Sequence, residues 1–145
     1  MNYIKGHIGR MFVLHFNDND ILLKEFDKFA KKERINAAVI HLLGALKDGD
    51  LVIGPKKAVV PSKPNWVKFK DGWEVLGFGT IFSGDKGPQV HIHTTMGKKT
   101  KTLCGCVRRD SKVFLRVEAV VFELKGVRTK KEIDPKTGLN FLNII

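Results

Sequence analysis

The sequence contains little cysteine and lacks a long apolar run. Its two cysteines, Cys104 and Cys106, are separated by a single glycine, a spacing that does not suit a disulfide. No apolar stretch is long enough to cross a bilayer, and the first residues contain no hydrophobic segment typical of a signal peptide. We therefore expect a protein of the reducing cytoplasm with no membrane partner.

Acidic residues are scarce relative to basic ones. The chain has 15 acidic and 26 basic side chains, which give a formal net charge of +11. Such an excess attracts polyanions such as nucleic acids, acidic membrane surfaces and anionic metabolites, although a lysine-rich surface also occurs in proteins adapted to heat. The candidate nucleic-acid contacts are the basic pairs Lys98 with Lys99 and Arg108 with Arg109. Aromatic residues are not interleaved with the basic pairs, which argues against stacking on single strands.

The order of apolar segments predicts an α+β fold. The 145 residues suffice for one domain, covering residues 1–145. Helical spacing of apolar residues predicts one main helix over residues 21–34. We expect turns at residues 47–50 and a β-hairpin around Asp71-Gly72. The other apolar segments predict a mixed, mostly antiparallel sheet, with strands at residues 8–16, 37–46, 51–53, 66–69, 73–82, 113–124 and 139–145.

Two histidines and two cysteines form the main candidate site. His91 and His93 lie two residues apart on a predicted strand and therefore share a face. If residues 98–99 form a two-residue turn, His93 faces Cys104 and His91 faces Cys106, which gathers four ligands that suit Zn²⁺. A three-residue loop would turn both cysteines to the other face. The alternative is that the histidines are polar strand residues and the cysteines small core residues, since no Cys-x-x-Cys or His-x-x-x-His motif supports a metal site.

Several segments match the motifs of one protein family. They include an opening strand, the start of the helix, an Ala-Ala-Val-Ile strand followed by Gly-Ala-Leu, a glycine-containing strand, the His-x-His pair and a late strand with glutamate: Gly9–Leu14, Asp20–Leu23, Ala37–Leu46, Glu74–Ser83, His91–His93 and Val117–Val120. Together these segments resemble the PPC (plants and prokaryotes conserved) domain, whose prokaryotic members are often called PD1-like DNA-binding proteins. The resemblance covers nearly the whole chain and implies a homotrimer in the cytoplasm.

The resemblance also implies a ligand set. The family has a third histidine in a Gly-Gly-His-Leu segment, and alignment on Glu118 puts Cys106 at that histidine. Because thiolate is an ordinary zinc ligand, the implied site is zinc held by His91, His93 and Cys106. Cys104 is then either a fourth ligand, which closes a structural site, or a small residue that leaves the site open. Glu118 is either a base or second-sphere partner of the metal, or a strand carboxylate paired with a basic side chain.

The leading interpretation is a trimeric metal-binding protein with a role in DNA binding or regulation. Plant relatives of the family bind DNA through AT-hooks, whose Arg-Gly-Arg-Pro core this chain lacks, so only the charge supports DNA binding. The alternatives are a zinc-dependent enzyme, in which metal-activated water attacks a small anionic substrate, and a binding module for such a ligand. The sequence identifies no substrate and no DNA sequence.

Overall fold

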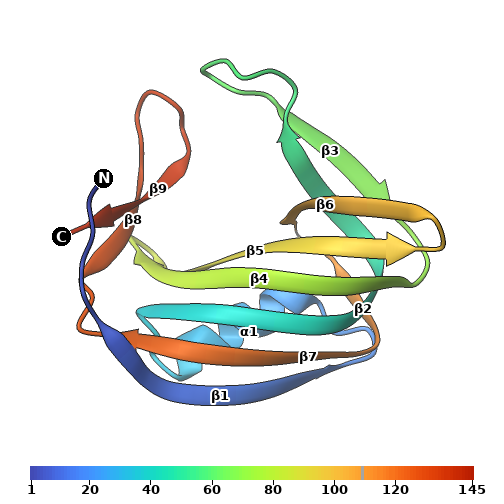
Figure 1. Ribbon diagram of the computed structural model, residues 1–145, viewed down its shortest axis with the longest axis horizontal. Coiled ribbons are helices and arrows are strands. Elements are labelled where there is room, and N and C mark those ends of the chain that lie inside the picture. Colours follow the sequence, from blue (N-terminus) through green and yellow to red (C-terminus); the bar gives the residue numbers. More distant parts are fainter. Residues whose placement is uncertain (109) are drawn as a thin grey trace.

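A computed structural model describes residues 1–108 and 110–145, and most of these residues lie in strands (Figure 1). The elements are β1 (His7–Asn17), α1 (Leu22–Lys32), β2 (Ala37–Pro55), β3 (Pro64–Phe69), β4 (Trp73–Gly84), β5 (Gly87–Lys98), β6 (Lys101–Val107), β7 (Lys112–Lys125), β8 (Thr129–Ile133) and β9 (Asn140–Ile144). All pairings are antiparallel except the single bridge between β4 and β8. The predicted α+β class, with one helix in the described chain and a mixed sheet, is confirmed.

Strand β2 organises the sheet because it changes partners along its length. Its first part, up to residue 48, lies between β7 and β4, whereas its second part, from residue 49, pairs with β3 and β6. Strand β4 also pairs with β5, and β5 pairs with β6. The pairings β2–β4–β5–β6–β2 therefore close on themselves. This circuit holds the β5–β6 hairpin, which carries the candidate ligands, against the second part of β2.

The predicted turn at residues 47–50 and the predicted hairpin at Asp71-Gly72 are both wrong. Strand β2 continues through residues 47–50. Its pairing with β7 is irregular between Gly44 and Asp48, which allows the strand to continue into this polar segment. Phe69, at the end of β3, and Trp73, at the start of β4, both pair with β2. Strands β3 and β4 thus follow one another along β2, and Asp71, with a φ of 63°, lies in the short break between them. The same Asp-Gly sequence suits a hairpin, in which β3 and β4 would pair with each other, and a break between two strands that both pair with β2. Only the pairing partner distinguishes the two cases.

Helix α1 packs against one face of the sheet. Its buried residues Leu22, Phe26 and Ala30 recur at intervals of four and join the main hydrophobic core. The basic residues Lys31 and Lys32 lie in its last turn, where positive charge suits the helix dipole. None of the described residues forms a helix that is long and apolar enough to span a membrane.

The opposite side of the sheet, which we call the outer face, exposes apolar side chains from neighbouring strands. They include Met11, Val13, Leu43, Leu76 and Phe78. Cross-strand pairing links this face to the candidate ligands in one row that runs through Val13, Val120, His41, Phe78, His93 and Cys106. The exposed apolar band and the candidate metal ligands therefore share one face.

Candidate metal centre

The register of the β5–β6 hairpin decides which side chains meet. His93 pairs with Cys106, and the turn lies at residues 99–100. A two-residue turn at residues 98–99, the condition on which the sequence put Cys104 opposite His93, does not form, and that register is wrong by two residues. Because two residues are one full period of a strand, the shift leaves every side chain on its predicted face. Both cysteines therefore still lie on the histidine face, and only their partners differ.

Three donor atoms converge on this hairpin. Nε2 of His91 lies 3.1 Å from Sγ of Cys106 and 3.2 Å from Nε2 of His93. Zn–N distances of about 2.0–2.1 Å and Zn–S distances of about 2.3 Å in a tetrahedral site correspond to N···N separations of about 3.3 Å and N···S separations of about 3.6 Å. The N···N distance matches this value and the N···S distance is about 0.5 Å shorter, so a small separation of the side chains would let two imidazoles and one thiolate hold Zn²⁺. Within the described part of the chain, the cluster consists of these three side chains.

The surroundings of the cluster shift the pKa values of two ligands. The pKa of the His91 imidazole is lowered to about 4. The main cause is partial burial, which disfavours the charged form, and the positive charges of Lys131, His93 and Arg108 act in the same direction. Burial raises the pKa of the Cys106 thiol, while Arg108 and Lys131 act in the opposite direction. Metal binding needs neutral imidazole and thiolate. His91 is therefore already in its binding form near neutral pH, whereas Cys106 must release a proton when it binds a metal.

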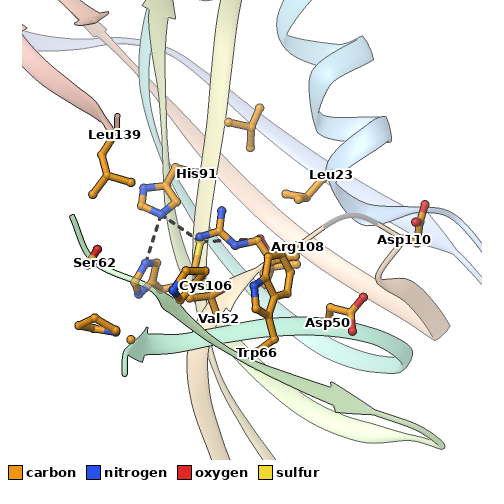
Figure 2. A pocket seen from close by; sticks show the side chains of 16 residues that line it. Leu23, Asp50, Val52, Ser62, Trp66, His91, Cys106, Arg108, Asp110 and Leu139 are labelled. Carbon is orange, nitrogen blue, oxygen red and sulfur yellow. Dashed lines mark hydrogen bonds between the residues drawn. The ribbon is translucent and has the colours of Figure 1, made fainter. Parts of the chain in front are cut away.

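The cluster lines an open cavity of about 1000 Å³ (Figure 2). Val52 of β2 and Trp66 of β3 belong to its wall, together with Ser62 from the β2–β3 connection and Leu139 from the β8–β9 connection. In Figure 1 both connections project at the top of the view, on the same side of β5, with the β8–β9 connection at the left and the β2–β3 connection towards the right. Arg108 extends into the cavity, with its guanidinium carbon 5.8 Å from the centre of the Trp66 ring. The three candidate ligands are thus accessible from a space large enough for a small molecule.

The structure does not bring Cys104 and Glu118 into the cluster. Cys104 is exposed and lies opposite Thr95, whose hydroxyl donates to the Cys104 sulfur at 3.7 Å. Glu118 lies on β7 between His15 of β1 and Leu43 of β2. It lines a second cavity of about 460 Å³ on the outer face. A metal held by the three clustered residues therefore keeps one coordination position free.

The basic candidate residues are separated by the hairpin. Lys98 and Lys99 lie at its turn, where the ammonium of Lys98 pairs with Asp71 at 3.2 Å. Arg108 follows the other end of β6, seven residues or about 23 Å of strand away, and lines the cavity. Arg109 lies outside the described residues. The lysine pair and Arg108 therefore belong to different surfaces.

Three residues around the centre were not predicted as site residues. Lys131 of β8 is only 9% exposed and influences the pKa values of both His91 and Cys106. Nothing in the sequence Thr-Lys-Lys-Glu-Ile of β8 indicates that this lysine, among several others, is buried. Trp66 was expected only as a strand residue, and Leu139 only as the start of a strand. Their place in the cavity wall depends on long-range pairing that sequence periodicity does not reveal.

Comparison with known proteins agrees with this architecture. The model of the Plants and Prokaryotes Conserved (PCC) domain matches residues 3–125. A metal-containing protein of Archaeoglobus fulgidus has 22% identity and a TM-score of 0.86, over 99% of each chain. A plant- and prokaryote-conserved protein of Pyrococcus horikoshii has 23% identity and a TM-score of 0.86, over 100% of this chain and 99% of its own.

A more distant structure has the same fold. The Ralstonia eutropha JMP134 protein described as "Putative DNA-binding protein" has 16% identity and a TM-score of 0.76, over 92% of this chain and 90% of its own. No curated protein matches the sequence. Because the family model covers most of the sequence, the chain belongs to the Plants and Prokaryotes Conserved domain family.

Proposed function

We propose that the protein binds one Zn²⁺ per chain through His91, His93 and Cys106 and presents the open coordination position to a small anionic ligand in the adjoining cavity. The observation that carries the proposal is the convergence of three donor atoms within 4.8 Å of one another at the wall of that cavity. The fold shared with a metal-containing protein of Archaeoglobus fulgidus adds support. A bound Zn²⁺ would supply a Lewis acid at this position.

The open position favours ligand binding over a purely structural role. Structural zinc sites are closed by four protein ligands, whereas functional sites keep a position for water or substrate. Cys104 lies opposite Thr95 and outside the cluster, so the described residues offer three ligands here. The reducing cytoplasm suits this arrangement because it keeps the Cys106 thiol free to coordinate. A hydrolytic enzyme remains the alternative within the same site.

The zinc proposal is tested by changing the two histidines together. Elemental analysis of wild-type protein purified without added metal should give about one zinc per chain. His91→Ala with His93→Ala removes two of three ligands, so it should lower the zinc affinity by at least about 100-fold, more than the loss of an outer-sphere partner costs. The matched control is His7→Ala with His15→Ala, which removes two histidines of β1 and should retain the zinc. Wild-type protein that contains no zinc and takes up none on titration would overturn the proposal.

In this proposal the chain assembles into a homotrimer, as the family resemblance implies. The outer face exposes Leu76 and Phe78 of β4 beside Leu43 of β2, a contiguous apolar surface of the kind that marks an interface. Two further copies of the same chain are the occupants we assign to it. The row of cross-strand pairs places His93 directly beside Phe78, so the metal centre adjoins this surface.

Duplex DNA is the second candidate partner. The net charge of +11 favours any polyanion, and the similar Ralstonia eutropha structure is named for DNA binding. Lys99 lies at an exposed turn, and Lys98 beside it is only partly engaged by the exposed Asp71. A trimer would present three copies of this turn. Sequence-independent contact with phosphates is the form of binding that this distribution supports.

The salt dependence of the affinity for duplex DNA tests this electrostatic binding. If six or more phosphates are neutralised, the affinity for duplex DNA should fall by about 10³-fold or more between 50 and 200 mM salt. Lys98→Glu with Lys99→Glu should weaken binding more than Lys24→Glu with Lys28→Glu, which makes the same change of charge on α1. Both can be followed by retardation of a duplex in gels. Equal weakening would indicate diffuse charge only, and no retardation of DNA by wild-type protein at low salt would exclude this role.

A further inference from the structure

The cavity beside the metal cluster combines unpaired positive charge with an uncovered aromatic surface. We infer that it binds an organic anion with a flat apolar body, whose charged group meets Arg108 and the metal and whose body lies against Trp66. The inference rests on the proposed zinc site and goes beyond it by naming the shape and chemistry of the ligand.

The positive charge next to the cluster lacks compensation. Among the described residues, neither Arg108 nor Lys131 forms an ion pair within 4.0 Å of a carboxylate. The Nε of Arg108 is buried and has no hydrogen-bond partner in the described structure. A buried donor normally finds a partner, because leaving it unmade is costly. A ligand with an acceptor oxygen would supply that partner.

The carboxylates of the cavity do not cancel this charge. Asp50 and Asp110 also line the cavity, and in Figure 2 they lie on the other side of Arg108 from His91. A zinc ion with one thiolate and two neutral imidazoles retains one positive charge, to which Arg108 adds a second. The part of the cavity next to His91 therefore favours a negatively charged group. A guanidinium can hold a carboxylate or a phosphonate through paired hydrogen bonds, so these two anionic groups share the chemistry required.

The rest of the wall requires an apolar body. Trp66 is 56% exposed although it lies at the cavity, and the guanidinium of Arg108 stands over its ring. Leu23, Val52 and Leu139 add aliphatic surface. An inorganic anion would leave this surface in water, whereas a flat hydrophobic group would cover it and gain from burial. The volume of about 1000 Å³ accommodates a bicyclic ring with room to spare.

Calorimetric titration of the zinc-loaded protein with 2-naphthoate tests this inference. We expect 2-naphthoate to bind at least about tenfold more tightly than acetate or inorganic phosphate, which lack the ring, and than 2-naphthamide, which lacks the charge. 2-Naphthylphosphonate should bind within about tenfold of 2-naphthoate if the anionic group alone matters. Binding of 2-naphthoate no tighter than that of acetate and 2-naphthamide would overturn the inference.

Variants assign the binding to the two named side chains. Arg108→Gln should lower the affinity for 2-naphthoate by about tenfold or more, and Arg108→Lys, which keeps the charge, should restore part of it. Trp66→Leu should lower the affinity for 2-naphthoate but leave the affinity for acetate unchanged. Lys28→Gln removes a cation from an exposed helix position and should bind like wild type. If the two Arg108 variants and Trp66→Leu, folded by circular dichroism, all bind 2-naphthoate like wild type, the site is not this cavity and the inference fails.

The same samples separate this inference from the zinc proposal. Zinc is measured in each by elemental analysis, and the titration is repeated after removal of metal by a chelator. Stoichiometric zinc without selective 2-naphthoate binding would refute the ligand inference and leave the zinc site standing. Binding that needs Arg108 and Trp66 in a protein that never takes up zinc would instead refute the zinc proposal and support the cavity ligand.

Discussion

Glu123 connects three parts of the protein through a single carboxylate. It lies nearly buried on β7, and its oxygens accept hydrogen bonds from Arg10 of β1 at 2.8 and 3.2 Å. Lys125 pairs with it at 2.8 Å, and Arg10 also reaches Glu33 at the end of α1. These hydrogen bonds, that from Arg10 above all, lower the pKa of Glu123 to about 2 although burial acts in the opposite direction. The ionised carboxylate is therefore the form that the fold stabilises.

The acid sensitivity of the protein should depend on Glu123. A carboxylate whose folded pKa lies below its usual 4.5 contributes stability above that pH and loses it as the pH falls towards 2. Glu123→Gln should lower the free energy of unfolding at pH 7 by about 1–3 kcal/mol. At pH 2 the variant and wild type should differ little. Urea unfolding at pH 7, 5, 3 and 2 measures this.

The control for that experiment is Glu25→Gln. Glu25 pairs with Lys28 on the exposed surface of α1, where such a pair contributes little. Its pH profile should follow that of wild type. If Glu123→Gln also follows wild type at every pH, the Arg10 pair does not stabilise the fold.

The members of the candidate metal cluster were predictable from the sequence to the extent that strand periodicity determines which side chains share a face. His91 and His93 share a face in any strand, and the family resemblance adds Cys106. The partner of Cys104 was not predictable, because the turn contains no Asn-Gly pair that would fix its position, and Gly97 remains inside β5. Lys131 was missed for a different reason, since its burial results from contacts of β8 with a strand far away in the sequence.

At the scale of elements, the glycines of β4 determine how closely β5 approaches. Glycine inside a strand marks either a bulge or a close backbone approach, and the uninterrupted pairing of β4 with β5 shows a close approach at Gly77 and Gly79. A Cβ atom on Gly79 would lie 2.7 Å from Cγ1 of Ile92 and 2.9 Å from the carbonyl oxygen of His91. The second contact is with backbone, so a side chain there requires β5 itself to move.

Gly79→Ala should therefore affect both stability and metal binding. We expect a loss of about 1–3 kcal/mol in the free energy of unfolding, which is typical of overpacking. The shift of His91 should weaken zinc binding by about tenfold, as the loss of an orienting contact does. Zinc titration in competition with a chelator, together with urea unfolding, measures the two effects.

Gly97→Ala is the matched control in β5. A Cβ atom at Gly97 would meet nothing within 4 Å, so both quantities should stay close to those of wild type. Unchanged zinc affinity in a destabilised Gly79→Ala would show that the strain is relieved at Ile92 and does not reach the ligand.

Periodicity predicted most elements but not their partners. The apolar repeat of α1 and the apolar content of β1, β4 and β7 identified these elements to within a few residues. The 19-residue length of β2 was missed because its polar middle, residues 47–50, resembles a turn. Its continuity comes from pairing with β7 on one side and with β3 and β4 on the other. Such support comes from residues distant in the sequence, which local patterns cannot show.

At the scale of the whole molecule, the sheet has one covered and one uncovered face. Helix α1 covers the inner face, whereas Leu76, the most exposed large apolar residue of β4 at 69%, projects from the outer face beside Leu43. Burying such residues contributes roughly 1.5–3 kcal/mol each, so an assembly that covers several of them has a substantial driving force. The three proposed zinc ligands all come from one hairpin of one chain. Assembly and metal binding are therefore separable properties.

A charged residue on the outer face should prevent assembly without affecting metal binding. Wild-type protein should show about three times the 16.3 kDa chain mass in light scattering. Leu76→Glu should yield monomers at micromolar concentration, because three carboxylates would be forced into an apolar interface. Val59→Glu introduces the same charge at an exposed apolar residue of the β2–β3 connection, outside the strands that carry Leu43, Leu76 and Phe78, and should remain trimeric. The Leu76→Glu monomer should still bind about one zinc per chain, and a wild-type protein that is monomeric under the same conditions would contradict the assembly.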